Sequence, residues 1–265
     1  MSLLSRSKET IKAGLNLHSG RGITVLPDDT FIVSYPKSGN TWTRFLIGAL
    51  YFGKPMLFSN IEEKVPDIYQ NTNKALLRVA QPRILKSHEY FEPRYRRVIY
   101  IARDPRDVLV SYYFHFRKFN YITDAVSLEE FAQSFFAGTL DPFGTWGENV
   151  GSWLGAREHN ADFLLLRYED MLRDTRAEAR RIVAFLKLSA TDAQLDAAIS
   201  SSSADNMRQL EREQGDQWKP LRETRKTIPF VRSAESGGWT KQLSPALAKA
   251  VEALWPQQMR RLGYS

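Results

Sequence analysis

The sequence of 265 residues contains no cysteine and only four histidines. Without cysteine the chain cannot form disulfides, zinc–thiolate sites or iron–sulfur clusters, and it has no thiol nucleophile. Four histidines are few for a metal cage, so we predict a site that works without a metal. The redox compartment stays open, because cysteine usage is the signal from which it would be inferred.

Long hydrophobic runs are absent as well. The longest, Phe45–Phe52, is too short to cross a bilayer and predicts a buried helix, so no membrane span is expected. Residues 1–22 contain cations but no apolar segment of signal-peptide length, which favours a cytoplasmic location over a cleaved leader. No repeat, low-complexity tract or linker divides the sequence, and we predict a single domain over residues 1–265.

What the sequence has in excess is positive charge. Lys and Arg number 37 against 30 Asp and Glu, which gives a formal charge of +7 and a pI near 9.5. This excess favours an anionic partner without identifying it. The chain also holds 6 Trp, 11 Tyr and 15 Phe, which suit a flat or apolar ligand and equally suit a large core.

Four short, nearly continuous apolar runs predict β-strands that are covered on both faces. They are Thr30–Ser34, Arg83–Ser87, Arg97–Ala102 and Phe163–Tyr168. Helical patterns alternate with them, and this alternation predicts an α/β fold in which helices flank a central parallel sheet. In such a sheet the ligand binds beyond the carboxyl ends of the strands.

The predicted helices follow from spacing and from capping residues. Apolar residues recur at helical spacing over 42–50, directly after the first strand. Asp104 precedes a proline and predicts the start of a helix that continues over Val108–Phe119. Thr175, with Glu178 three residues later, predicts a capped helix after the last strand.

The segment 214–240 is charged, irregular and long for a loop. Long irregular segments in compact domains are often functional lids, so we predict that this one covers the cofactor or the substrate. A closing helix over Pro245–Leu262 is expected to complete the domain.

A phosphate-binding loop is predicted between the first strand and its helix, at Ser34–Thr41. Compared with the G-x-x-x-x-G-K-[ST] pattern of nucleoside-triphosphate enzymes, Gly39 and Thr41 are kept, whereas Asn40 replaces the lysine. A lysine lies inside the loop instead, at Lys37. Backbone amides and Lys37 can bind a phosphate, but the magnesium-triphosphate apparatus is incomplete. A plain strand-to-helix turn with a solvated lysine is the alternative.

This loop and four later segments, in the same order, resemble the cytosolic sulfotransferases. The segments are Tyr35–Trp42, Ile84–His88, Val98–Tyr113, Leu166–Met171 and Arg232–Trp239. That family transfers a sulfuryl group from 3′-phosphoadenosine 5′-phosphosulfate (PAPS) to a hydroxyl or amine, and its fold is similar to that of nucleotide kinases. The resemblance therefore implies a P-loop, nucleotide-kinase-like sulfotransferase fold, PAPS as co-substrate and PAP as product.

The resemblance also implies roles for single residues. Lys37 would meet the charge that grows on the bridging oxygen, and His88 would take the acceptor's proton. By the same resemblance Lys86 would assist His88. The two residues are two positions apart, so their side chains point to the same face of an extended segment. The positions implied to bind the cofactor are Lys37, Ser38, Gly39, Asn40, Thr41, Trp42, Arg103, Ser111, Tyr168 and Arg232.

Some positions depart from the family pattern. In the last motif Ser233 replaces a lysine and Ala234 a glycine, which leaves open how strongly this segment holds the 3′-phosphate. Ala204 stands where the family often places a phenylalanine against adenine, and Thr240–Ala246 does not reproduce the family's dimer motif. Packing in the core is the alternative role of Trp42 and Tyr168.

Other residues receive no site role. His18, His115 and His159 are expected to be surface or packing residues, and only Arg103 is assigned among the cations between Arg94 and Lys118, most of which are expected to be solvated.

Three other functions stay open beside PAPS-dependent sulfuryl transfer. They are a nucleotide kinase, a PAPS- or PAP-binding protein without turnover, and a nucleic-acid-binding protein, of which the last is disfavoured because the cations are spread along the chain. We predict a small hydroxyl or amine acceptor and no nucleic acid, and leave the oligomeric state open. An apolar acceptor pocket is suggested by Tyr90, Phe91, Phe114, Phe116 and Phe119.

Overall fold

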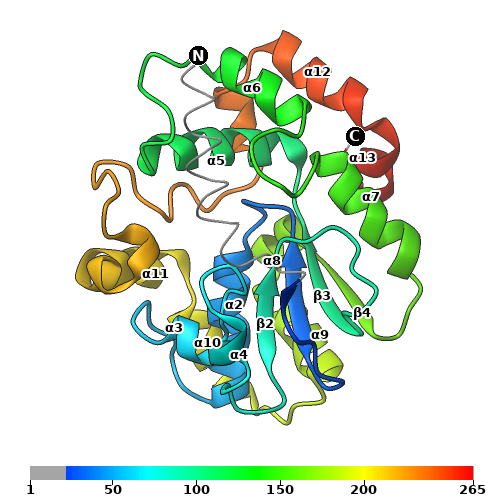
Figure 1. Cartoon of the computed structure of the whole chain (residues 1–265), viewed down its shortest axis with the longest axis vertical. Coiled ribbons are helices and arrows are strands. Elements are labelled where there is room, and N and C mark those ends of the chain that lie inside the picture. The colour runs from blue at the N-terminus through cyan, green and yellow to red at the C-terminus, as the bar shows by residue number, and fades with distance from the viewer. Residues whose placement is uncertain (1–21, 265) are drawn as a thin grey trace.

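Four parallel strands form the centre of the molecule, in the order β2-β1-β3-β4. They are β1 (Thr30–Ser34), β2 (Ile84–Ser87), β3 (Arg97–Ala102) and β4 (Phe163–Arg167) (Figure 1). The computed structural model describes residues 22–264, so the expectations for the leader and for His18 lie outside the described residues. The predicted α/β fold with a central parallel sheet is confirmed, and two strands are one residue shorter than predicted.

Helices cover both faces of the sheet, because successive strand residues point to opposite sides. Ile32 packs in a cluster with the apolar faces of α2 (Asn40–Phe52), α9 (Thr175–Leu186) and α10 (Asp192–Ser201). Val33, its neighbour in the chain, belongs to the larger cluster on the other face. The sheet is therefore buried on both sides, as its continuous apolar strands predicted.

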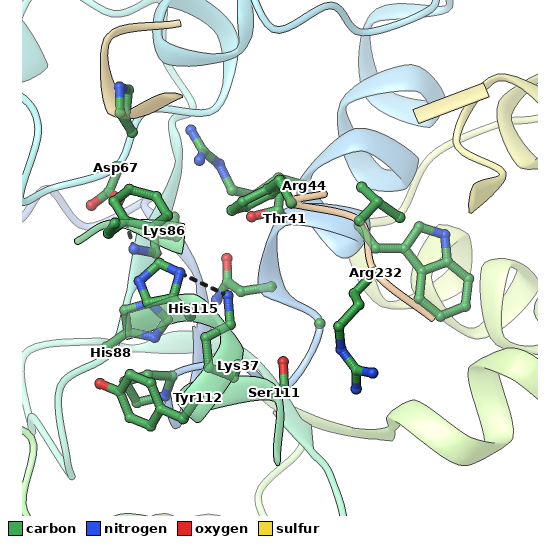
Figure 2. A pocket seen from close by; sticks show the side chains of 18 of the residues that line it. Lys37, Thr41, Arg44, Asp67, Lys86, His88, Ser111, Tyr112, His115 and Arg232 are labelled. Atoms are coloured by element: carbon green, nitrogen blue, oxygen red, sulfur yellow. Dashed lines mark hydrogen bonds and ion pairs between the residues drawn. The ribbon is translucent and has the colours of Figure 1, made fainter. Parts of the chain in front are cut away.

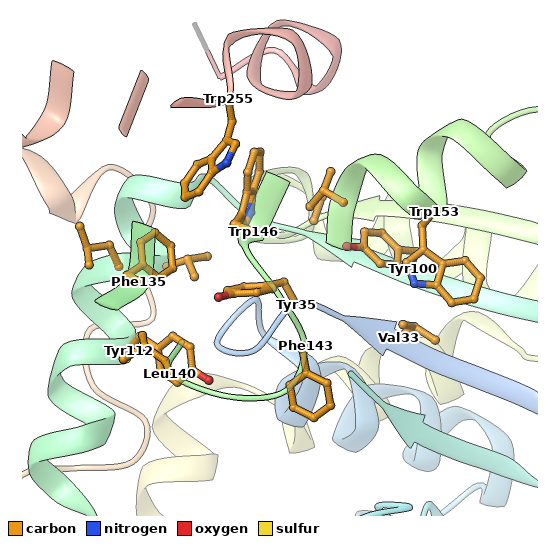
Figure 3. Packing of buried hydrophobic residues seen from close by; sticks show 14 of the residues in the cluster. Val33, Tyr35, Tyr100, Tyr112, Phe135, Leu140, Phe143, Trp146, Trp153 and Trp255 are labelled. Atoms are coloured by element: carbon orange, nitrogen blue, oxygen red, sulfur yellow. The ribbon is translucent and has the colours of Figure 1, made fainter. Parts of the chain in front are cut away.

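Aromatic residues fill the larger cluster (Figure 3). Trp146 and Trp255 lie with ring centroids 5.5 Å apart, and Phe135 packs edge-on against Trp255. The indole N–H of Trp146 donates to the carbonyl of Arg103 at 3.1 Å, so this core supports the carboxyl end of β3. The helices around it are α5 (Pro105–Lys118), α6 (Leu128–Phe136), α7 (Trp146–Arg157), α12 (Pro245–Leu254) and α13 (Pro256–Leu262).

Two helix boundaries differ from the predictions. The closing helix is broken at Trp255, because Pro256 has no N–H to donate and disfavours a helical conformation in the residue before it. Asp174, not Thr175, caps α9, since the Asp174 carboxylate accepts from the amide of Ala177 at 2.9 Å. Thr175 is already the first helical residue.

The remaining elements are mostly short, and four of them lie in or directly before the long irregular segment. They are α3 (Ile61–Lys64), α4 (Asn73–Leu76), α8 (Tyr168–Arg173), α11 (Ala204–Gln214), η2 (Gly215–Gln217), η3 (Lys219–Leu221) and η4 (Gly238–Lys241). The buried Lys118 at the end of α5 ties this segment down by donating to the carbonyls of Arg225 and Ile228 at 3.3 and 2.7 Å. Over residues 22–264, no helix has both the length and the apolar character to cross a membrane.

Candidate active site

A cavity of about 650 Å³ opens at the carboxyl ends of the strands, which is the predicted position (Figure 2). Each strand contributes to it through the residues that follow its end, and the segment 218–234 closes another side. The predicted site residues that line this cavity are Lys37, Gly39, Asn40, Thr41, Trp42, Lys86, His88, Arg103, Ser111, Tyr168 and Arg232.

The loop between β1 and α2 is shaped to receive an anion. Gly39 has a φ of 96°, and a side chain there would lie 2.6 Å from the Tyr168 ring, so both backbone and space require glycine. The first helical hydrogen bond runs from the Thr43 amide to the Gly39 carbonyl, which leaves the amides of residues 40–42 outside the helical pattern. The first turn of α2 has no acidic residue, so its positive end is not neutralised.

Two loop residues are engaged mainly with the protein. Ser38 is fully buried, does not line the cavity, and uses its amide to donate to the Tyr35 carbonyl at 3.3 Å. The Asn40 side chain donates to the Ile32 carbonyl and to the Ser34 hydroxyl, so it ties the loop to β1. It cannot act as the lysine of a triphosphate loop does.

Lys37 occupies the centre of the cavity in a left-handed backbone conformation, with φ 68°. Its ammonium nitrogen lies 3.3 Å from Nδ1 of His115 and 5.2 Å from the centre of the Phe230 ring. Burial first, and then the nearby charges of Arg103 and Lys86, lower the pKa of Lys37 to about 7. Because no described carboxylate pairs with it, Lys37 is suited to an anionic ligand.

His88 is held in one orientation and one tautomer. Its Nδ1 lies 2.7 Å from the Ser34 carbonyl, which can only accept, so Nδ1 carries the hydrogen and Nε2 keeps its lone pair. Its backbone amide donates to the Tyr69 hydroxyl at 2.9 Å. Burial and the charge of Lys86 lower the pKa of His88 well below 6.5, so the ring is neutral at neutral pH.

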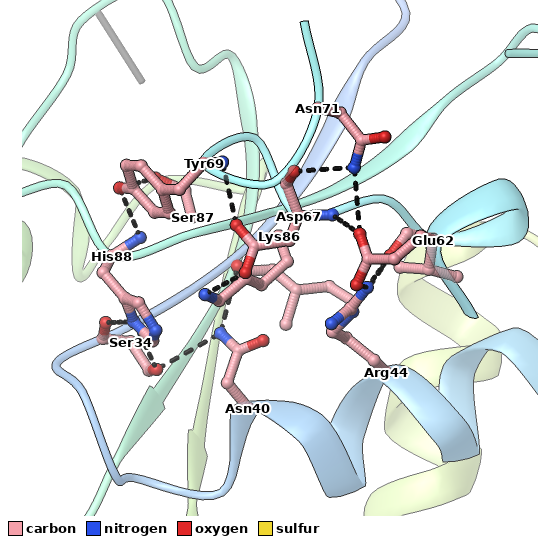
Figure 4. A network of polar contacts seen from close by, with 12 residues as sticks. Ser34, Asn40, Arg44, Glu62, Asp67, Tyr69, Asn71, Lys86, Ser87 and His88 are labelled. Atoms are coloured by element: carbon pink, nitrogen blue, oxygen red, sulfur yellow. Dashed lines mark hydrogen bonds and ion pairs between the residues drawn. The ribbon is translucent and has the colours of Figure 1, made fainter. Parts of the chain in front are cut away.

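Lys86 is fixed by a carboxylate (Figure 4). Its ammonium lies 2.6 Å from Oδ2 of Asp67, and Asp67 is oriented in turn by the amide of Tyr69 at 2.9 Å. The ion pair of Arg44 and Glu62 lies beside this group, and Glu62 also accepts from the Asp67 amide. The prediction that Lys86 and His88 face the same cleft is confirmed, since both line the cavity.

An aromatic and cationic wall lies on the other side of the loop. The Arg103 guanidinium stacks 4.2 Å from the centre of the Tyr168 ring, and Trp42 meets that ring edge-on at 5.5 Å. Arg103 also donates to the carbonyls of Lys37 and Glu235, at 3.2 and 3.1 Å. Trp42 and Tyr168 therefore pack against protein while each still lines the cavity.

Arg232 lies beside this wall without an acceptor. Its guanidinium stacks on Phe114 at 4.7 Å, and within residues 22–264 no atom accepts a hydrogen bond from it. Burial and then the charge of Arg103 lower the pKa of Arg232. Ser111, on α5, lines the same region. The guanidinium groups of Arg103 and Arg232 keep N–H donors that no acceptor among the described residues uses, and the Ser111 hydroxyl lies beside them. Such a group of donors suits a phosphate.

The chain around Arg232 is held by two charged side chains. Arg208 donates to the carbonyls of residues 231–233, at 3.0 to 3.1 Å. The Asp107 carboxylate accepts from the amides of Gly237 and Trp239, at 2.7 and 2.9 Å. Ala234 has a φ of 52°, a left-handed conformation that favours glycine. The departure from the family pattern at this position therefore carries a backbone cost.

His115 is more than the surface or packing residue that was expected. It packs on the Phe119 ring at 4.2 Å, but it also lines the cavity and contacts Lys37, and burial lowers its pKa well below 6.5. Its position one helical turn after Ser111 on α5 was the signal that could have revealed it.

Six cations between Arg94 and Lys118 received no role. Lys118 and Arg106 are buried, and Arg106 pairs with Asp104, whereas the other four are partly or fully exposed, as expected for most of this group.

The described part of the chain contains no group of three or more His, Cys, Asp or Glu side chains that could hold a metal ion. Around the phosphate-binding loop, the cavity's polar groups are mainly lysines, arginines, neutral histidines and backbone amides. Such groups bind and stabilise oxyanions.

Comparison with known proteins agrees with this chemistry. The sequence profile of the sulfotransferase domain matches residues 27–263. Sulfotransferase 1E1 of Bos taurus is 30% identical over 259 residues, which cover 92% of this chain and 87% of that protein.

Two crystal structures share the fold at lower identity. Mouse sulfotransferase SULT7A1, complexed with PAP, is 24% identical, with a TM-score of 0.77 over 95% of this chain and 90% of the other. Retinol dehydratase, in a complex with retinol and PAP, is 19% identical, with a TM-score of 0.78 over 95% and 86%. The predicted family and the predicted fold are confirmed: the chain belongs to the sulfotransferase domain family.

Proposed function

We propose that the protein transfers a sulfuryl group from PAPS to a hydroxyl, or to an amine, of a small acceptor. The observation that supports this most is the convergence of Lys37, His88 and the anion-binding loop on one cavity. A neutral histidine with a free Nε2 is a base, and a lysine at an anion site stabilises a leaving phosphate.

The charges of the cavity suggest how PAPS would lie. The amides at the start of α2 and Lys37 would bind the 5′-phosphosulfate, whereas Arg103, Ser111 and Arg232 would bind the 3′-phosphate. The adenine would pack between Trp42 and Tyr168, beside the space that Ala204 leaves. Ser38 would support the loop through its buried position rather than contact the cofactor.

The reaction needs one base and one stabilising cation. The acceptor oxygen forms a bond to sulfur while the bond from sulfur to the bridging phosphate oxygen breaks, in line. The acceptor's proton moves to Nε2 of His88, and the charge left on the 5′-phosphate of PAP is met by Lys37. Lys86, oriented by Asp67, would keep His88 neutral and ready to accept.

The segment 214–240 would cover both substrates. It contributes Trp218, Phe230 and Arg232 to the cavity wall and is fastened at Lys118 and Asp107. Exclusion of water by such a cover protects the activated sulfate from hydrolysis.

A nucleotide kinase fits this site less well. Asn40 replaces the phosphate-loop lysine and directs its side chain toward β1, and the described residues contain no cluster of three or more His, Cys, Asp or Glu side chains that could hold a metal ion. A binding protein without turnover would not need His88 held with Nε2 free.

Transfer from PAPS that carries radiolabelled sulfate tests the proposal. Phenols, alcohols, amines and sugars would be incubated with the protein, with and without EDTA. We expect a labelled organic sulfate that forms equally with EDTA present. Label transferred to none of these acceptors, or phosphate transferred from magnesium-ATP instead, would contradict it. We also expect no binding to nucleic acid, and we keep the cytoplasm as the predicted location, which cell fractionation would test.

A further inference from the structure

The cavity continues beyond His88 into a region that we call the aromatic end. It is lined by Tyr69, Tyr112, Phe116, Phe119, Tyr121 and Phe143. The Phe143 ring lies 5.5 Å from the His88 ring and 5.1 Å from that of Tyr69, so the aromatic wall begins at the proposed base. Rings at this spacing suit a flat acceptor.

One charged group faces this otherwise apolar region. Among the described residues, two carboxylates line the cavity, Asp67 and Asp141. Asp67 is neutralised by Lys86 at 2.6 Å. Asp141 has only uncharged partners: the Tyr112 hydroxyl donates to Oδ2, and the Phe143 amide donates to Oδ1 at 2.8 Å.

The charge of Asp141 is therefore unbalanced. Within residues 22–264 no lysine, arginine or histidine comes within ion-pair distance of it. Burial raises the pKa of Asp141 to about 6, so the group is ionised at neutral pH despite its surroundings. A partly buried carboxylate without a cation is costly, and the cost falls if a ligand brings the missing charge.

We propose that the acceptor is a small aromatic alcohol that also carries a protonated amine, with its ammonium bound by Asp141 and its hydroxyl at His88. This inference rests on the proposed function, because it assigns the acceptor of that same site. The rings of Phe116, Tyr121 and Phe143 would contact the acceptor's ring, and their π faces attract an ammonium as well.

The binding mode decides which group is sulfated. An ammonium held by Asp141 keeps its proton and has no lone pair, so it cannot attack sulfur. The hydroxyl is left as the nucleophile, and its proton passes to Nε2 of His88. The cations at the other end do not oppose the ammonium, because Asp67 balances Lys86 and the sulfate of PAPS would balance Lys37.

Three phenols of the same size separate charge from shape. Tyramine carries an ammonium, tyrosol carries a neutral hydroxyl at the same position, and para-ethylphenol carries neither. The wild-type protein would be compared with Asp141→Asn, and Asp162→Asn serves as the control because Asp162 is exposed and precedes β4 at the opposite end of the sheet.

We expect the wild-type kcat/KM to be highest for tyramine, and Asp141→Asn to lower that value by roughly 10–100-fold, as for loss of a charge-assisted contact. The values for the two neutral phenols should change less than about threefold. Asp162→Asn should change none of them. Equal wild-type values for the three phenols, or an equal fall for all three in Asp141→Asn, would overturn the inference. The wild-type kcat/KM values for the three phenols can overturn the inference without any variant, so the test remains valid even if Asp141→Asn folds poorly.

Calorimetric titration separates this inference from the proposed function. The same phenols would be added to the protein saturated with PAP, where no transfer occurs. Tighter binding of tyramine without any turnover would contradict the proposed function while supporting Asp141 as the site that binds the ammonium. Transfer to neutral phenols without any preference for tyramine would support the proposed function and contradict the assignment of an ammonium-bearing acceptor.

Discussion

The two ends of the cavity are built in different ways. The cationic end uses short continuous segments that follow β1, β3 and β4, together with Arg232 from the segment 214–240, and it presents backbone amides and guanidinium groups. The aromatic end takes its side chains from α5 and the residues directly after it, from residues 140–143 and from the segment before β2, which are far apart in the sequence. The cationic end suits a ligand whose phosphates lie at fixed positions. The shape of the aromatic end depends on side-chain packing, so substitutions there can alter which acceptor fits.

This contrast separates two tasks. Binding and activating the sulfate donor needs charges in fixed positions. Hydrogen bonds that involve backbone carbonyls keep Lys37, His88 and Arg103 in such positions. Selecting the acceptor needs only shape and one charge, Asp141. We therefore expect substitutions at the first end to affect every acceptor alike, and substitutions at the second to affect them selectively.

The largest effects should come from the reacting groups. His88→Ala should lower kcat by about 10²–10⁴-fold for every phenol, because it removes the base. Lys37→Ala should lower it by about 10²–10³-fold through loss of charge stabilisation on the leaving phosphate. Steady-state transfer assays with saturating PAPS would measure both.

Matched variants control for folding in these two cases. The His159 side chain is 94% exposed, so His159→Ala removes a histidine without touching the cavity. Lys187 also has a left-handed conformation, with φ 55°, so Lys187→Ala reproduces the backbone change of Lys37→Ala at a helix end. Near-normal rates in either site variant would refute the mechanism.

Arg103→Ala should act on binding more than on chemistry, because its proposed partner is the remote 3′-phosphate. We expect PAP to bind about 10–100-fold more weakly, with a smaller change in kcat. Arg103→Lys should recover part of the affinity but not the bidentate geometry. Arg96→Ala, at an exposed position before β3, is the control, and equal affinity for PAP in Arg103→Ala and the parent would refute the placement.

Lowering the pH should remove the preference of the aromatic end for an acceptor that carries an ammonium, while the transfer step itself continues. As pH falls through about 6, Asp141 gains a proton and loses its attraction for an ammonium. His88 and His115 stay neutral there because burial lowers their pKa values, and the pKa values of Tyr35 and Tyr112 lie far above this range.

The ratio of kcat/KM for tyramine to that for para-ethylphenol isolates this effect. Changes in Lys37, whose pKa is lowered to about 7, act on both phenols and cancel in the ratio. We expect the ratio to fall roughly tenfold from pH 8 to pH 5. A ratio that stays constant over this range would show that Asp141 does not bind the ammonium of the acceptor.

The smallest effect concerns the backbone of the cationic end. Ala234→Gly should relieve the left-handed conformation and stabilise the fold by up to about 1 kcal/mol, or roughly 2–4 °C in Tm. Gly237→Ala, at a φ of 75°, should do the opposite and is the matched comparison. A lower Tm for Ala234→Gly would show that the conformation at this position is not strained.

The two ends also differ in how far the sequence could predict them. The apolar runs predicted all four strands, and the spacing of Lys86 and His88 placed both in the cleft, because a strand fixes the direction of each side chain. His115 was missed because its aromatic neighbours in the sequence are typical of a packed helix; its position one turn after Ser111 was the one signal that pointed to the cavity. Asp141 gave no signal in the sequence. Its proposed role follows from the lack of a cation beside it among the described residues of the folded structure and from its contact with Tyr112 on α5.

A crystal structure with PAP and tyramine bound would test the account most directly. We predict that the 5′-phosphate of PAP contacts the amides at the start of α2 and Lys37, and that the 3′-phosphate contacts Arg103 and Arg232. The phenol oxygen should lie within hydrogen-bond distance of Nε2 of His88, with the ammonium at Asp141. PAP bound at the aromatic end, or a phenol oxygen out of reach of His88, would contradict the assignment of the two ends.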